Sequence, residues 1–348
     1  MVAAWVKWVL AAVVVVALGV IGYSGWSVWT AYRTVEGISQ LEFDPVQTRA
    51  ELRQDVEAEP PEQDPVASVE EERADQLRTF LIVGDDNRPG FGGNRADVIL
   101  MGLLPPGEGS PILFSIPRDL YIPSPCTGAS VRINTLLSGC GTTATGPEVL
   151  AVAVEDFTGT NVNHFALIDF AGFEEIVDAF GGVQICLEYA IRDDKVNYEG
   201  VILPAGCSIA DGAQALAWVR SRRTLEYVEG IGWRTQPGVN DLVRNERQQQ
   251  LLFALLARVG RLRDITRLVG LAESVADAVV VDEGLSVTEG VGLVWGLRGL
   301  AQEDVIQLTV PVEYHTTPNG ASVLRPIGDF ADLVRQTLAG VVAEADSA

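Results

Sequence analysis

The chain has 348 residues, of which 47% are hydrophobic, a proportion that provides a buried core and excludes wholesale disorder. Its 25 basic and 47 acidic residues give a net charge of −22 at pH 7, which argues against nucleic-acid binding, because phosphate contacts need a basic face. With two histidines, no CxxC pair and no glycine-rich phosphate motif, the chain lacks support for zinc, P-loop and dinucleotide sites.

The N-terminus predicts a membrane anchor. Residues 8–29 carry no charge and as a helix would be about 33 Å long, enough to cross a hydrocarbon core of about 30 Å. Tryptophans stand near both ends of this run. Lys7 precedes it and acidic residues follow, so we expect residues 1–7 in the cytoplasm, a single pass through the cell membrane, and the rest outside. A cleaved signal peptide is the alternative.

The next segment, residues 30–76, is acidic and interrupted by prolines, as in Glu59-Pro60-Pro61-Glu62. This composition predicts a solvated linker that holds a domain away from the membrane. The domain itself is expected over residues 77–345.

Periodicity and capping residues predict alternating strands and helices in this domain. Strands are expected at 79–84, 97–104, 111–116, 163–168, 183–187, 305–310 and 322–326. Helices are expected at 147–158, 170–180, 211–220, 241–258, near 265–280, at 286–298 and from Phe330 onward. Strands mixed with helices throughout predict an α/β fold in which a central mixed β-sheet is flanked by helices on both faces.

Four cysteines fit an exported domain, because disulfides persist in oxidising compartments. Four cysteines allow three pairings, and the sequence does not select one. The pairing that closes the shortest loops joins Cys126 to Cys140 and Cys186 to Cys207. Four buried free thiols are the alternative.

Five polar clusters that all contain arginine stand at the ends of predicted elements. They are Gly84–Arg88, Arg95–Asp97, Ser115–Asp119, Arg220–Arg222 and Asp241–Gln249. One such cluster alone would be read as a solvated surface, whereas five together suggest one arginine-built site. Because guanidinium groups bind phosphoryl oxygens in a bidentate manner, the expected ligand is a phosphate or pyrophosphate.

The helix expected over 241–258 supports this interpretation. At about 100° per residue, Asp241, Arg244, Gln248, Leu251 and Leu252 share one arc of about 100°, with Arg247 beyond its edge. One face therefore begins polar and ends apolar, which suits an anionic head on an apolar tail. The alternative is an arginine–aspartate network that only caps the core.

Two carboxylates near these arginines predict a metal site. Asp86 and Asp97 would repel a phosphate, and a divalent cation, Mg²⁺ or Mn²⁺, would remove that conflict. Cation and arginines together would stabilise the charge that develops in phosphoryl transfer. Asp241 would take the proton from an attacking hydroxyl.

These motifs resemble the LytR-CpsA-Psr family of membrane-anchored, extracytoplasmic phosphotransferases of bacterial cell-wall assembly. The matching sequences are GDDNR, RADVILMGL, SIPRDLYI, RINTLLSGCG, FEEIVDAFGGV, DGAQALAWVRSR and DLVRNERQQ, all within residues 77–260. The resemblance implies a central mixed sheet between helices with an apolar tunnel for a lipid tail. It implies transfer of a glycopolymer from a polyprenyl (undecaprenyl or decaprenyl) pyrophosphate carrier to peptidoglycan, through a phosphodiester.

Carried over by position, the resemblance assigns a role to each residue. Asp86 and Asp97 match the metal-associated aspartates, and Asp241 matches the proton acceptor. The residues that match the pyrophosphate site are Arg88, Arg95, Arg118, Arg132, Arg220, Arg222, Arg244 and Gln248. Of these, Arg118 and Arg244 are also expected to act in catalysis. Arg132 stands where a lysine is common in the family.

The segment 223–240 matches no family motif. It contains Tyr227, Trp233 and Arg234, side chains that suit a sugar, so one interpretation is an acceptor-binding loop and the other a surface insertion. His164 and His315 are interpreted as structural and surface residues.

Two other functions fit the same residues. The site would act as a hydrolytic pyrophosphatase if water replaced the acceptor. Without transferase activity, the protein would be a membrane-tethered polyprenyl-pyrophosphate binding or regulatory protein.

Overall fold

The computed structural model describes residues 39–54, 77–86, 94–107, 109–196, 200–236, 241–260, 278–285, 293, 296–297 and 300–345. The predicted membrane span over 8–29 lies outside these residues, as do most of the helices predicted near 265–280 and at 286–298. Among the residues described, no helix is both long and apolar enough to cross a membrane.

The centre of the fold is a seven-stranded mixed sheet, as the sequence predicted. Its strands, in spatial order, are β1 (Ser39–Leu41), β14 (Val279–Asp282), β7 (His164–Asp169), β2 (Arg78–Asp85), β3 (Ala96–Leu104), β4 (Ile112–Ser115) and β15 (Ile306–Thr309). Strand β2 is parallel to β7 and antiparallel to β3, while β4 is antiparallel to β3 and parallel to β15. The carboxyl ends of β7, β2, β4 and β15 therefore meet at one edge of the sheet, where β3 begins.

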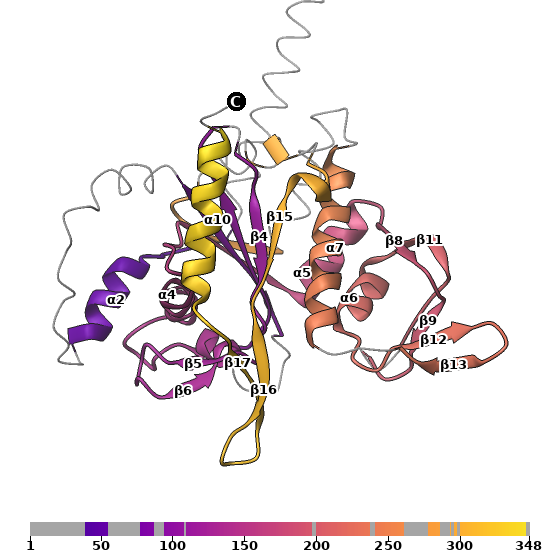
Figure 1. Ribbon diagram of the computed structural model, residues 1–348, viewed down its shortest axis with the longest axis horizontal. Helices are drawn as coiled ribbons and strands as arrows, with labels where there is room; N and C mark the ends of the chain where they lie inside the picture. Colours follow the sequence, from indigo (N-terminus) through magenta and orange to yellow (C-terminus); the bar gives the residue numbers. More distant parts are fainter. Residues whose placement is uncertain are drawn as a thin grey trace, which may run out of the picture.

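One face of the sheet is covered by α4 (Gly146–Thr158) and α10 (Phe330–Ala345), and α2 (Pro45–Gln54) packs on α4 (Figure 1). Ile112 and Phe114 point to this face, and the Phe114 ring lies 5.2 Å from that of Phe330. Helix α4 begins beside a Thr145–Glu148 pair, in which the Glu148 carboxylate accepts hydrogen bonds from the Thr145 backbone N–H at 3.2 Å and from the Thr145 hydroxyl at 2.7 Å.

The opposite face is covered by α7 (Asp241–Gly260), which is accompanied by α5 (Phe170–Ala179) and α6 (Gly212–Arg220). Leu113 alternates with Ile112 and Phe114, so it points to this second face, where it packs with Phe253 of α7. Leu251 of the same helix packs with the core around α6. Helices thus lie on both faces, in agreement with the sequence.

Smaller strands and two 3₁₀ turns surround this body. They are β5 (Tyr121–Pro123), β6 (Ser130–Arg132), β8 (Val183–Leu187), β9 (Ile191–Asp193), β10 (Val201–Leu203), β11 (Gly206–Ala210), β12 (Leu225–Val228), β13 (Gly232–Thr235), β16 (Val312–Thr316) and β17 (Ser322–Pro326), with turns at Ile133–Ser138 and Gln302–Asp304. The strand order β10-β9-β12-β13 forms a separate sheet, and the β12–β13 hairpin and the β16–β17 ribbon both project from the body (Figure 1).

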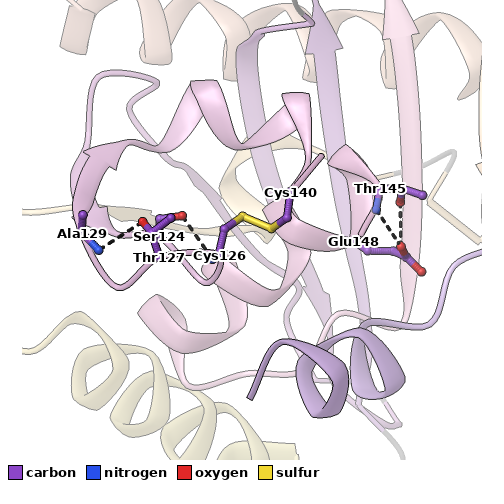
Figure 2. The surroundings of a disulfide bond; sticks show 7 residues. All are labelled: Ser124, Cys126, Thr127, Ala129, Cys140, Thr145 and Glu148. Atoms are coloured by element: carbon purple, nitrogen blue, oxygen red, sulfur yellow. Dashed lines mark hydrogen bonds between the residues drawn. A yellow bond between two sulfur atoms is a disulfide. The ribbon is translucent and has the colours of Figure 1, made fainter. Parts of the chain in front are cut away.

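Two disulfides confirm the pairing that closes the shortest loops. Cys126, in the loop after β5, is bonded to Cys140, which follows the first 3₁₀ turn (Figure 2). The Ser124 hydroxyl accepts a hydrogen bond from the backbone N–H of Cys126 at 3.2 Å and so holds this loop. Cys186 and Cys207 stand directly opposite each other on β8 and β11 and form the second bond.

The linker prediction for residues 30–76 is wrong over 39–54, which form β1 and α2 of the domain. Strand β1 pairs with β14, far away in the sequence, so local composition could not reveal it. Helix α2 is held by Arg49, whose guanidinium lies 2.9 Å from both Glu155 and Asp156 of α4. The helix predicted near 265–280 is wrong at its last residues. Val279 and Val280 belong to strand β14, which pairs with β7 in the central sheet.

Candidate functional site

Acidic residues gather at the sheet edge where the strand ends meet. Asp85 ends β2, Asp169 ends β7 and pairs with Asp85 in register, and Asp97 stands at the start of β3. Ser115 ends β4 at the same edge. The topology alone therefore brings together polar residues that are far apart along the chain.

A β-bulge determines where Asp97 stands. Gly84 is opposite Val98 but Asp85 is opposite Ala96, so Asp97 is an extra residue in β3. The bulge is held by the backbone N–H of Arg95, which donates to the Asp85 carboxylate at 3.2 Å, and by that of Asp86, which donates to the Arg95 carbonyl at 3.1 Å. Extra residues of this kind re-aim a side chain, and here the re-aimed side chain is a carboxylate.

From the bulge, an alternating row of charges runs along the loop after β4. The Arg118 guanidinium is bonded to Asp97 and lies 3.5 Å from Asp119, and Asp119 lies 3.2 Å from Arg132. Arg132 also donates to the Ser322 carbonyl at 2.9 Å, and the Leu324 N–H donates to the Asp119 carbonyl. The β16–β17 ribbon, from the C-terminal part of the chain, therefore supports this row.

A second arginine–aspartate pair lies at the end of α6. The Arg220 guanidinium is 3.6 Å from Asp86 and stacks over the Phe170 ring at 3.9 Å from its centroid. The turn after Arg220 is held by Asp193, which is buried and accepts hydrogen bonds from the Ser221 hydroxyl and the Arg223 N–H. Burial would raise the pKa of Asp193, but these hydrogen bonds and one from the Lys195 N–H together lower it, so the carboxylate stays charged.

Helix α7 contributes a polar residue and a structural arginine side by side. Gln248 is buried, and its Oε1 lies 3.5 Å from the Ser115 hydroxyl, which donates to it. The neighbouring Arg247 is also buried and donates to the carbonyls of Trp218 and Ser221, to the Thr224 hydroxyl and to Gln236. Adjacent helix residues point in different directions, so one side of α7 faces the sheet edge and the other binds the hairpin that follows α6.

The electrostatics of the edge favour a cation. Burial, the largest cause, and the charges of Asp86, Asp169 and Asp97 together raise the pKa of Asp85 to about 6, against the Arg95 N–H bond, which lowers it. Crowded carboxylates of this kind fit a divalent ion. However, no group of three or more histidine, cysteine or acidic side chains is arranged to hold a metal within the described part of the chain. Two aspartates would therefore need oxygen ligands from a substrate and from water.

The structure brings most of the predicted site residues to this one region. Asp97, Arg118 and Arg132 share the charge row; Asp86 and Arg220 form the second pair; Gln248 reaches Ser115. Arg95 is exposed beside the bulge, and Arg222 is exposed two residues after Arg220. Arg88 lies outside the described residues, as do the side chains of Asp241 and Arg244, whose backbones belong to the first turn of α7.

Sequence reasoning missed three residues here. Asp85 was passed over beside Asp86, although a strand that ends in two aspartates places them on opposite faces. Asp119, the link between Arg118 and Arg132, stands inside a quoted motif. Arg247 lies beyond the edge of the polar arc, and its hydrogen bond to Thr224 depends on a tertiary contact that helix geometry does not predict.

Comparisons with known proteins place the chain among relatives of one family. The family model LytR_cpsA_psr matches residues 44–339. A probable cell wall biosynthesis protein, LcpB of Corynebacterium glutamicum, is 32% identical over 250 residues, which are 67% of this chain and 54% of the relative. The polyisoprenyl-teichoic acid–peptidoglycan teichoic acid transferase TagV of Bacillus subtilis is 24% identical over 249 residues, 70% of this chain and 59% of the relative.

The crystal structure of B. subtilis TagV shows the same fold, with a TM-score of 0.63 at 23% identity over 77% of this chain and 98% of that one. In the sequence comparisons, the chain spans little more than half the length of the two relatives.

Proposed function

The chain belongs to the LytR_cpsA_psr family, and we propose that it transfers a glycopolymer from a polyprenyl pyrophosphate carrier to peptidoglycan through a phosphodiester bond. The observation that carries the proposal is the edge of the sheet, where Arg118 and Arg220 each meet an aspartate next to the polar part of α7. The names of the relatives, a cell wall biosynthesis protein and a teichoic acid transferase, support the same class of reaction.

The arginines are the groups that would bind the pyrophosphate. In the structure their charge is balanced by Asp97 and Asp86, so an entering pyrophosphate competes with these carboxylates for the guanidinium groups. A bound Mg²⁺ or Mn²⁺, held by Asp86 and Asp97, would neutralise these carboxylates and the developing phosphoryl charge. Arg118 and Arg220 then turn toward the phosphoryl oxygens, and Arg132, Arg222 and the rest of the predicted set complete the site.

Helix α7 indicates where the polyprenyl tail of the carrier would lie. Four residues beyond Gln248 the helix enters an apolar cluster of Leu252, Phe253 and Leu256 with Leu113 of the sheet. A pyrophosphate at the sheet edge would leave its polyprenyl chain beside this cluster. This direction agrees with the polar-to-apolar face expected from the sequence.

The chemical step is a displacement at phosphorus. The acceptor hydroxyl oxygen forms a bond to the phosphorus that carries the glycopolymer, and the bond from this phosphorus to the polyprenyl phosphate breaks. Asp241, the first residue of α7, would accept the hydroxyl proton, and Arg118 with Arg244 would stabilise the charge on the leaving phosphate.

The proposed location is outside the cytoplasmic membrane, anchored by residues 8–29. Two disulfides support an oxidising compartment, since such bonds rarely persist in the cytosol.

The test uses the purified full chain with a polyprenyl pyrophosphate-linked saccharide and peptidoglycan fragments. Mass spectrometry should detect the saccharide phosphate on peptidoglycan together with free polyprenyl phosphate. Release of polyprenyl phosphate without transfer would identify a pyrophosphatase instead. Binding of the carrier without turnover, even with Mg²⁺ or Mn²⁺, would identify a binding or regulatory protein.

A further inference from the structure

The β12–β13 hairpin presents two aromatic rings on one face. Tyr227 and Trp233 stand directly opposite each other in register, and their rings meet edge to face with centroids 5.5 Å apart. They are 46% and 37% exposed, whereas most large apolar side chains of the described chain are covered. The Arg192 guanidinium, from the neighbouring strand β9, lies 4.7 Å from the Trp233 centroid and holds this ring in place.

The other face of the hairpin is used for internal stability. Glu226 is buried and is bound by Arg234 through two hydrogen-bond donors, at 2.6 and 2.7 Å, from directly across the strands. Arg234 therefore lies opposite the aromatic face and does not belong to a ligand surface with Tyr227 and Trp233. The ion pair keeps the two strands in register, so the aromatic rings are already fixed before any ligand arrives.

The hairpin is tied to the arginine site at its base. Thr224 and Gln236, the residues just before and after the two strands, are joined by a backbone hydrogen bond of 3.0 Å and are both bound by Arg247. Arg247 is the neighbour of Gln248, which reaches the sheet edge. At about 3.4 Å per residue, Tyr227 lies about 10 Å along the strand from this clamp.

The size and charge of this surface restrict its occupant. A Tyr or Trp side chain buries about 150–250 Å², so two rings that are less than half exposed offer about 200 Å², well below the roughly 800 Å² that a stable protein interface needs from each partner. A net charge of −22 also opposes a second copy and a nucleic acid. A pyranose ring fits, because its C–H face stacks on an aromatic ring and its hydroxyl rim accepts hydrogen bonds from a guanidinium.

We propose that Tyr227, Trp233 and Arg192 bind the glycan strand of the peptidoglycan acceptor. This inference rests on the proposed transfer function. The donor would be bound through its pyrophosphate and its tail. An acceptor strand has no phosphate for the arginines to bind, so it needs a separate binding surface. The projection of the hairpin from the body (Figure 1) lets a polymer outside the protein reach it, while the Arg247 clamp keeps it at a fixed place relative to the site.

The experiment compares Trp233→Ala and Tyr227→Ala with the wild-type full chain. Co-sedimentation with insoluble, polymer-free peptidoglycan sacculi should weaken about tenfold for each variant, and the KM for peptidoglycan fragments should rise by a similar factor at unchanged kcat. Release of polyprenyl phosphate from the donor without acceptor should not change. Trp233→Phe should restore most of the binding. Tyr314→Ala, which removes a 63% exposed ring from the β16–β17 ribbon, is the matched control and should behave as wild type.

Wild-type sacculus binding and transfer by Trp233→Ala and Tyr227→Ala would overturn the inference and leave the transfer function intact. An equal loss of donor turnover would also overturn it, because the rings would then contact the donor saccharide. Light scattering that shows a dimer for the wild type and monomers for these variants would also overturn it, because the rings would then form an interface between two copies of the chain. If the wild type transfers nothing but its sacculus binding still depends on Trp233, the transfer function fails and the glycan surface stands.

Discussion

Arg220, the last residue of α6, lies 3.6 Å from Asp86, which follows strand β2, so a helix end and a strand end about 130 residues apart meet as an ion pair. Arg118 and Asp97 make the equivalent contact one strand away. In both pairs a residue predicted to bind phosphate is balanced by a residue predicted to bind metal. Under the proposed function, each of these ion pairs would separate when a pyrophosphate and a cation bind, because both compete for the same charged groups.

Substitution of the aspartates tests the metal. Asp97→Asn and Asp86→Asn should lower Mg²⁺-dependent transfer roughly a hundredfold, because the cation loses a charged ligand. The measurement is initial rate against Mg²⁺ concentration. Asp332→Asn, which removes an exposed carboxylate paired with Arg335 on α10, should leave the rate unchanged. Wild-type rates in both site variants with the metal chelated would remove the metal assignment.

Arg118→Ala should reveal the competition between arginine and cation. Without metal, the buried Asp97 loses its ion pair with Arg118, and the free energy of unfolding should fall by about 1–3 kcal/mol. Mg²⁺ should restore part of this loss, because the vacated carboxylate becomes available to the ion. Thermal unfolding with and without Mg²⁺ measures both effects. Arg118→Lys should recover stability better than activity, since an ammonium cannot make two parallel hydrogen bonds. A stability loss with full activity per folded molecule would leave only a structural network.

Arg247→Ala tests the clamp between α7 and the hairpin. Its four acceptors, at Trp218, Ser221, Thr224 and Gln236, would lose buried donors, and we expect a destabilisation of about 2–3 kcal/mol in urea unfolding. Arg335→Ala, 68% exposed on α10, is the control and should change stability by about 0.5 kcal/mol or less. Equal stability of the two variants would contradict the clamp.

The disulfides can be tested by mapping and by replacement. Peptides from the oxidised protein should show Cys126 bonded to Cys140 and Cys186 to Cys207. Replacing Cys126 and Cys140 together by serine opens a loop with a sequence separation of 14 and should cost about 3 kcal/mol of stability. Recovery of four free thiols from exported protein would argue against both bonds and against the oxidising compartment.

Glu155, which joins α4 to α2, should make stability depend on pH. Burial raises its pKa above the ordinary value of 4.5, against the lowering effects of the Val162 N–H and Arg49. The folded state therefore holds the proton more tightly than the unfolded state, and this residue's contribution to stability falls as pH rises from 4.5 through the raised pKa. Glu155→Gln cannot lose a proton, so its stability relative to wild type should increase over that window. An equal difference in the free energy of unfolding between Glu155→Gln and the wild type at pH 4 and at pH 7 would contradict this linkage.

Much of the fold could be read from local patterns. Apolar runs predicted β2, β3, β4 and β7, and the capping residue Asp211 predicted the start of α6, because these signals act within a few residues. The arginine clusters were visible in the same way, since each stands at the end of an element. The spacing of the cysteines left three pairings open, and the structure selects the one that closes the shortest loops.

By itself the sequence thus determined the main strands and helices of the central layers, their order, and the arginine clusters that stand at their ends. Tertiary structure alone decided that Ser39–Leu41 join β14 in the central sheet, that Asp85 is buried among other carboxylates, and that Arg247 binds the hairpin while Gln248 faces Ser115. The physical reason is range: propensity and capping depend on neighbours in the chain, whereas strand pairing, burial of a charge and the partner of an arginine depend on residues that only packing brings together.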